Sequence, residues 1–100
     1  KVEVQTRVGE EARGNLTEEQ RKFLSALGDT LSECEWTDRA IGDCIRSVTA
    51  EIGIGGRDAY VALYWVILGK SHGPRVASIM AEMEAGTTLS LLHDSTIDLA

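Results

Sequence analysis

The chain has 100 residues, of which 43% are hydrophobic, and its formal net charge at pH 7 is −6. This length suits one domain with a single modest core, and no apolar run reaches the roughly 20 residues that cross a bilayer, so we expect a soluble protein without a membrane partner. Non-specific affinity for nucleic acid comes from many basic contacts, so the acidic charge argues against DNA and confines any RNA binding to a local site.

The N-terminal residues predict little regular structure. Val2 and Val4 alternate briefly with polar residues, and the segment then becomes polar and rich in glycine, so residues 1–15 are expected to be a linker or a frayed start. We expect one helical domain over residues 16–93 and a weakly patterned tail over residues 94–100. The missing initiator Met indicates a fragment of a longer protein.

Two helices are marked by residues that suit their N-termini. Thr17, with Gln20 three positions later, matches a capping box, and the apolar stripe that follows predicts a helix to about Glu35. Thr37 is a second N-cap candidate. The apolar residues after it recur at helical spacing as far as Gly53, which is a typical C-cap residue.

The second half of the chain predicts three more helices. The segment 57–68 is apolar on nearly every face, which is typical of a helix in the middle of a bundle, and Gly69 ends it. Pro74 suits the first position of a fourth helix that Gly86 closes, and a short fifth helix follows. No strand pattern is convincing, so the predicted fold class is all-α, a small bundle of about five helices.

No catalytic, metal or cofactor site is indicated. The motif Gly69-Lys70-Ser71 ends like a phosphate-binding P-loop, but Tyr64 stands where the first glycine belongs and no strand precedes the motif. A small phosphoryl-transfer enzyme stays as an alternative, which stabilisation by ATP would reveal. The two cysteines form no CxxC pair, which favours a reducing cytoplasm. The spacing of the possible zinc ligands matches no zinc motif; these are Cys34, Cys44, His72 and His93.

Positive charge gathers between the third and fourth predicted helices. No acidic residue occurs from Ala59 to Ala81, whereas Lys70, His72 and Arg75 fall within six positions. Arg75 and the unpaired N–H groups of the next helix start can hold an anion. Lys70 can equally serve only to offset the negative end of the preceding helix dipole. The glutamate-rich faces elsewhere either dock a basic partner or simply solvate the helices.

At this region the chain resembles the anticodon-binding region of class I lysyl-tRNA synthetases, and more loosely that of glutamyl-tRNA synthetases. The matching motifs are Leu63-Tyr64, Leu68-Gly69-Lys70 and Gly73-Pro74-Arg75. The resemblance implies an α-helical cage that receives the anticodon stem-loop of tRNA(Lys). It also implies a separate catalytic domain in the same parent chain, which uses ATP to aminoacylate the tRNA. The chain would then be a cytoplasmic part of a lysine-tRNA ligase that lacks the active site.

The resemblance further implies which residues meet the RNA. Sequence-specific RNA readers stack unpaired bases on aromatic or guanidinium planes and hold phosphates with a few cations. Arg75 is therefore the first RNA-binding candidate and Lys70 the second, followed by His72, Tyr64 and Trp65. The alternative function is an acidic helical protein-interaction module derived from a synthetase, which a parental gene without the nucleotide-binding half would favour.

Overall fold

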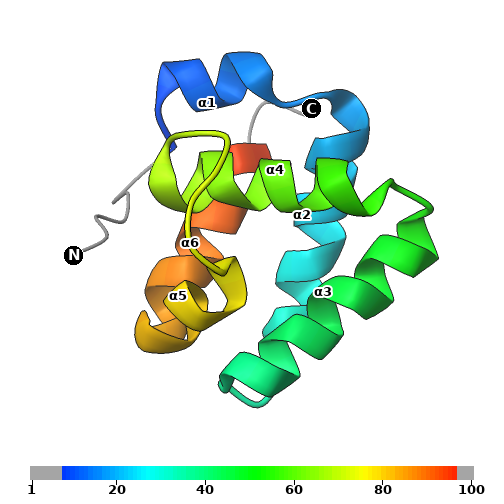
Figure 1. Cartoon of the computed structure of the whole chain (residues 1–100), viewed down its shortest axis with the longest axis vertical. Coiled ribbons are helices and arrows are strands. Elements are labelled where there is room, and N and C mark those ends of the chain that lie inside the picture. The colour runs from blue at the N-terminus through cyan, green and yellow to red at the C-terminus, as the bar shows by residue number, and fades with distance from the viewer. Residues whose placement is uncertain (1–7, 97–100) are drawn as a thin grey trace.

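A computed structural model describes residues 8–96 and confirms the all-α fold class (Figure 1). Within that range the chain forms six helices rather than about five. Their bounds are α1 Glu10–Asn15, α2 Glu18–Leu31, α3 Asp38–Ile52, α4 Gly56–Leu68, α5 Val76–Glu82 and α6 Ala85–Thr96. None of these helices combines the length and the apolar character that a membrane span requires.

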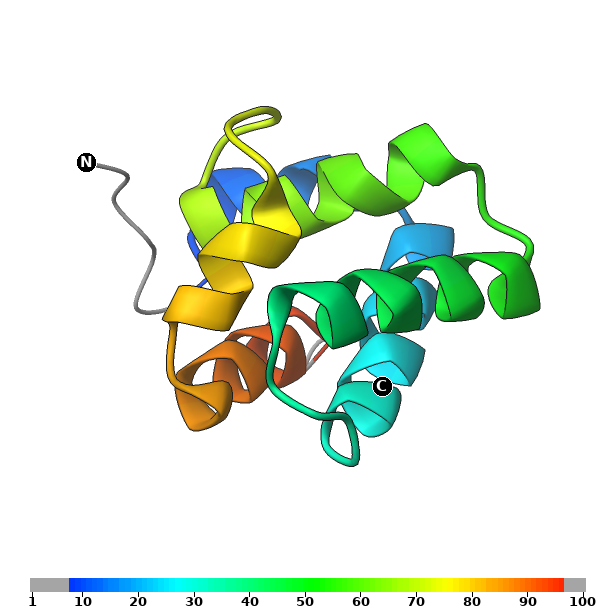
Figure 2. The same ribbon diagram turned by 60° about the horizontal axis from the view of Figure 1, so that its bottom comes forward.

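Helix α4 occupies the middle of the bundle, as its apolar sequence predicts. It contacts α1, α2, α3, α5 and α6, and Ala59, Ala62 and Leu63 are completely buried. The small alanine side chains let neighbouring helices approach closely. In Figure 2, α4 runs across the upper side of the molecule, above α3 and α6. The remaining core lies where α2 packs against α3 and α6.

The predicted N-caps of α2 and α3 are confirmed. The Thr17 hydroxyl accepts the Gln20 N–H at 3.1 Å, and Gln20 Oε1 accepts the Thr17 N–H at 2.9 Å, which completes the capping box. The Gln20 side-chain amide also donates to the Asp58 carbonyl at 2.9 Å, so the same residue ties α2 to the start of α4. Thr37 caps α3 by accepting the Ala40 N–H at 3.1 Å.

Glycines end α3 and α4 as predicted, because Gly53 and Gly69 adopt left-handed φ angles of 80° and 73°. Helix α2, by contrast, ends at Leu31 and not near Glu35. Continuing it would place the carboxylates of Glu33 and Glu35 at the negative end of the helix dipole. The chain instead leaves the helix through tight turns.

The structure corrects the prediction for the N-terminal segment. Glu10–Asn15 of the expected linker forms α1, which lies against α4. Asp94 on α6 holds this helix by accepting the Val8 N–H at 3.0 Å and the Arg13 guanidinium at 2.7 Å. So short a helix is not stable alone and shows no periodic stripe, so only its tertiary contacts reveal it. The rest of the predicted linker, residues 1–7, lies outside the described residues.

The last two helices also differ from the prediction. Helix α5 spans only Val76–Glu82, so neither Pro74 nor Gly86 marks its ends. Gly86 lies instead in the first turn of α6. That helix continues into the predicted tail as far as Thr96, because its buried face packs against α2. Residues 97–100 of the predicted tail lie outside the described residues.

Replacing Asp94 with Ala is expected to lower the free energy of unfolding by about 1–2 kcal/mol, because the hydrogen bonds from Val8 and Arg13 to α6 are lost. The side chains of Arg13 and Asp94 are only 23% and 29% exposed, so solvent screens this ion pair incompletely. Urea unfolding, monitored by circular dichroism, measures the change in the free energy of unfolding. Glu51→Ala, at an exposed carboxylate, is the control. Equal stability of the two variants would contradict the role given to Asp94.

Candidate functional site

The loop between α4 and α5, residues 69–75, is held in shape by side chains of α4. The Tyr64 hydroxyl donates to the Pro74 carbonyl at 2.7 Å. Gly73 approaches the helix so closely that a Cβ there would lie 2.5 Å from Cδ1 of Leu68, which is itself buried. Tyr64 and Gly73 therefore set the path of the loop, and the sequence motif has a structural role at these positions.

The side chains in the middle of the loop face solvent. Lys70 and His72 are exposed, and the Ser71 hydroxyl lies 3.4 Å from Nδ1 of His72. Figure 2 shows this segment projecting beyond the end of α4. Trp65 is half-buried and packs against the core, and Tyr64 is half-buried beneath the loop. Lys70 and His72 are thus the predicted site residues that a partner reaches most directly.

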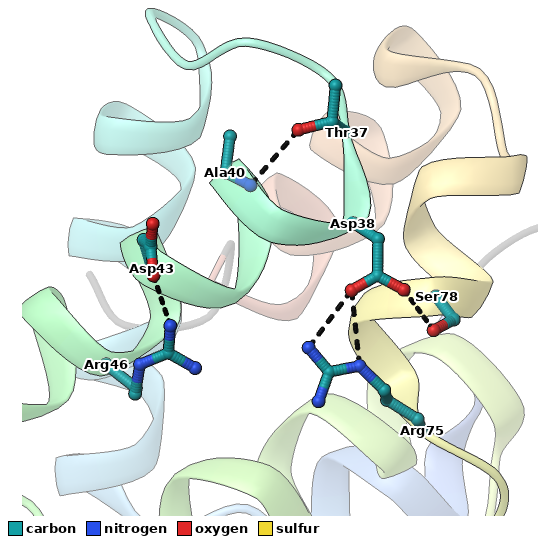
Figure 3. Close-up of polar contacts among 7 residues, drawn as sticks. All are labelled: Thr37, Asp38, Ala40, Asp43, Arg46, Arg75 and Ser78. Carbon is teal, nitrogen blue, oxygen red and sulfur yellow. Dashed lines mark hydrogen bonds and ion pairs between the residues drawn. The ribbon is translucent and has the colours of Figure 1, made fainter.

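The Arg75 guanidinium is bound by Asp38 of α3 (Figure 3). Its Nε and Nη2 atoms donate to one carboxylate oxygen at 3.2 and 3.0 Å, and the Ser78 hydroxyl donates to the other oxygen. The pKa of Asp38 is lowered most by the hydrogen bond from Ser78 and next by that from Arg75. The Asp38 carboxylate in turn raises the pKa of Arg75. The Arg75 and Asp38 side chains remain 59% and 45% exposed.

This ion pair changes the expected charge of the region. The stretch from Ala59 to Ala81 has no acidic residue in sequence, but the packing of α3 against α5 brings Asp38 to it in space. Arg75 is the N-cap of α5 and makes no side-chain cap bond, so it lies just before the first helical turn and not within it. Its side chain crosses to α3 and does not lie over the start of its own helix.

A second arginine, Arg46, reaches the same surface from α3. It forms an exposed ion pair with Asp43, one turn earlier on the helix. A Cβ at Gly42 would lie 3.2 Å from Nη2 of Arg75 and 3.5 Å from Nη1 of Arg46. Arg46 could not be identified from the sequence, because its approach to Arg75 depends on helix packing. A glycine inside a helix was the one local signal that another group comes close here.

A separate open hollow of about 630 Å³ lies between the end of α2 and α3. The pKa of the Cys34 thiol is raised to about 11, mainly by burial and to a smaller extent by a hydrogen bond with Cys44. The thiol therefore stays protonated at neutral pH and is a poor nucleophile. The acidic rim repels anions, so the hollow does not suit a phosphate. Its acidic lining residues are Asp29, Glu33, Glu35 and Asp43.

Comparison with known proteins identifies the family. The family model described as "Anticodon binding domain" matches residues 2–94. A lysine-tRNA ligase of Archaeoglobus fulgidus is 35% identical over 69% of this chain and 14% of its own length. A lysine-tRNA ligase of Methanococcus maripaludis is 28% identical over 69% of this chain and 13% of its own length. A glutamate-tRNA ligase of a Polaromonas species is 31% identical over 78% of this chain and 17% of its own length.

These relatives are much longer proteins, and the chain spans about 13–17% of their length. No solved structure shows significant similarity to it. The family match covers nearly the whole chain and includes α1, the loop at residues 69–75 and α6 up to Asp94. The chain belongs to the anticodon-binding domain family.

Proposed function

We propose that this chain is the C-terminal anticodon-binding domain of a class I lysyl-tRNA synthetase. In this proposal it positions tRNA(Lys) for ATP-dependent aminoacylation by a separate catalytic domain of the same parent chain. ATP acts in that other domain, and the parent enzyme works in the cytoplasm. The observation that carries the proposal is the family match over residues 2–94, which includes the lysyl-type motif ending at Gly73-Pro74-Arg75.

The shape of the loop at residues 69–75 supports an RNA partner. RNA loops are recognised through unstacked bases and through phosphates that lie close to a few cations. Lys70 and His72 project from a loop whose end is held at Pro74 by Tyr64, so less backbone has to be ordered when they meet a partner. A basic loop on an acidic domain also directs a polyanion to one face.

The five candidate residues take different roles in this proposal. Lys70 and His72 contact the RNA from the loop, and Arg75 contacts it from the start of α5. Tyr64 uses its hydroxyl to hold Pro74, which leaves the exposed part of its ring for contact with a base. Trp65 offers only the part of its indole that the core does not cover.

The test measures binding of the 100-residue chain to the tRNA(Lys) anticodon stem-loop and to stem-loops with one anticodon base replaced. Each base that is read is expected to contribute about 1–3 kcal/mol, so the native stem-loop should bind roughly 5- to 150-fold more tightly than a stem-loop in which that base is replaced. Arg75→Ala should weaken binding about tenfold. Arg57→Ala, at the other end of α4, removes the same charge and should change little. Equal affinity for every stem-loop would refute anticodon recognition.

A further inference from the structure

Two guanidinium groups from different helices converge above Gly42. Nη2 of Arg75 and Nη1 of Arg46 both lie within 3.5 Å of the point where a Gly42 Cβ would stand. Figure 3 shows the two groups turned toward each other on the same side of α3. A hydrogen bond from N–H to oxygen spans about 2.9 Å, so one tetrahedral anion placed beside this point can accept from both groups.

Each guanidinium is held in place by a carboxylate of α3. Asp38 binds Arg75 through one oxygen and accepts the Ser78 hydroxyl on the other, and Asp43 binds Arg46. The two arginines are each 59% exposed. An arginine has more N–H donors than these bonds use. Among residues 8–96, the aspartates bind Nη2 of Arg46 and the Nε and Nη2 atoms of Arg75, and no acceptor binds Nη1 of either arginine. Each Nη2 atom also has a second N–H, so donors on both groups are available to a ligand.

The surroundings of the pair suit nucleic acid more than a small free anion. Tyr64 on α4 is only partly buried, and its hydroxyl donates to the carbonyl of Pro74, the residue before Arg75. The loop that carries Lys70 begins at the end of the same helix. Guanidinium groups beside aromatic rings form a surface that holds a phosphate and the sugar or base next to it. The two aspartates balance the formal charge of the two arginines, so attraction to a phosphate depends on guanidinium N–H donors that the aspartates leave unused and on the charge of Lys70 nearby.

We propose that Arg46 and Arg75 together bind one phosphodiester group of an RNA backbone, with Gly42 as the bare floor of the site. This inference rests on the proposed function, since it assigns a ligand group to the surface beside the loop at residues 69–75. Asp38 and Asp43 are positioning residues that keep the two like charges facing each other. A phosphate contact sets the register of the RNA without reading its sequence.

The test compares wild type, Arg46→Ala, Arg75→Ala and the double variant. It measures their affinities for the native and base-altered tRNA(Lys) anticodon stem-loops at several salt concentrations. Arg46→Ala is expected to weaken binding of every stem-loop by the same factor, about tenfold, and to reduce the slope of log K against log salt by about 1. Because both arginines bind one phosphate, the double variant should lose little more than either single variant. Arg57→Ala is the charge-matched control.

Gly42→Ala tests the floor of the site separately. Its Cβ would stand 3.2 Å from Arg75 Nη2, so the guanidinium must move, yet Ala is the better residue in a helix interior. We expect an equal or higher Tm together with weaker RNA binding. A purely structural role of Gly42 would instead lower the Tm and leave affinity intact. Affinity equal to that of wild type would overturn its role as the floor.

The other outcomes separate the two proposals. If wild type discriminates among stem-loops but Arg46→Ala keeps the wild-type affinity and salt slope, the phosphate site is refuted and anticodon recognition stands. If Arg46→Ala changes the preference among anticodon bases, Arg46 reads a base and the phosphate assignment is wrong. If wild type binds none of the stem-loops, the proposed function fails and the phosphate site fails with it. Circular dichroism checks that each variant is folded.

Discussion

Replacing Phe23 with Ala is expected to lower the free energy of unfolding by about 3–5 kcal/mol. Phe23 is completely buried on α2, the helix that packs against α3, α4 and α6. Truncation removes the contacts of the ring and leaves a cavity that the surrounding helices fill only in part. A native domain has a total stability of about 5–15 kcal/mol, so the loss is a large part of the total. At the urea concentration where wild type is half unfolded, this variant should be almost completely unfolded.

Urea unfolding at constant temperature measures the effect of Phe23→Ala as a fall in the midpoint with an unchanged m-value. Lys22→Ala is the matched control, because Lys22 is the preceding residue on α2 and its side chain is 66% exposed. That variant should stay within about 0.5 kcal/mol of wild type. A loss below 1 kcal/mol for Phe23→Ala would show that the ring is not packed as the structure has it.

Replacing Trp36 with Ala is expected to lower the free energy of unfolding by about 2–3 kcal/mol, less than for a fully buried aromatic residue because Trp36 is half-buried. Its indole N–H donates to the carbonyls of Met80 and Met83 at 3.0 and 2.9 Å. These carbonyls lie at the C-terminal end of α5, where helices leave acceptors unpaired. Trp36 thus holds the end of α5 against the segment before α3.

Trp36→Phe separates the two parts of this effect. It keeps most of the ring but removes the N–H donor, so we expect about 1–2 kcal/mol of destabilisation, roughly half of that in Trp36→Ala. The measurement is again urea unfolding at constant temperature. A Trp36→Phe variant as stable as wild type would mean that the indole hydrogen bonds do not contribute. Equal losses in the two variants would assign the whole effect to those bonds.

The parts of the fold that could be predicted from sequence depend on contacts within a few residues. Thr17 with Gln20, Thr37, Gly53 and Gly69 all act on their own helix ends, and the structure places each where the local pattern predicts it. The central position of α4 follows from its composition alone, since a helix with apolar residues on every face must be covered on every face. These features needed no knowledge of how the helices pack.

The parts that could not be predicted depend on distant partners. Helix α1 is held by Asp94, which no pattern near residue 10 indicates. The same reasoning applies to the candidate site. An acid-free stretch of sequence predicted a local concentration of positive charge that includes Arg75, but Asp38 reaches Arg75 from α3. Arg46 joins the surface for the same reason, because the packing of α3 against α5 brings together residues far apart in sequence.

The bond between the Val8 N–H and Asp94 joins residues 86 positions apart. A ribosome makes the chain from its N-terminus, so the partner of the first helix is among the last residues of the domain to appear. Until then α1 is held by its packing on α4 and by Arg21 of α2, which donates to the Arg13 carbonyl at 3.0 Å. The contacts of α6 with α2 and α4 also form only after α6 has left the ribosome, so apolar surface on both helices stays exposed to aggregation until the last helix is made.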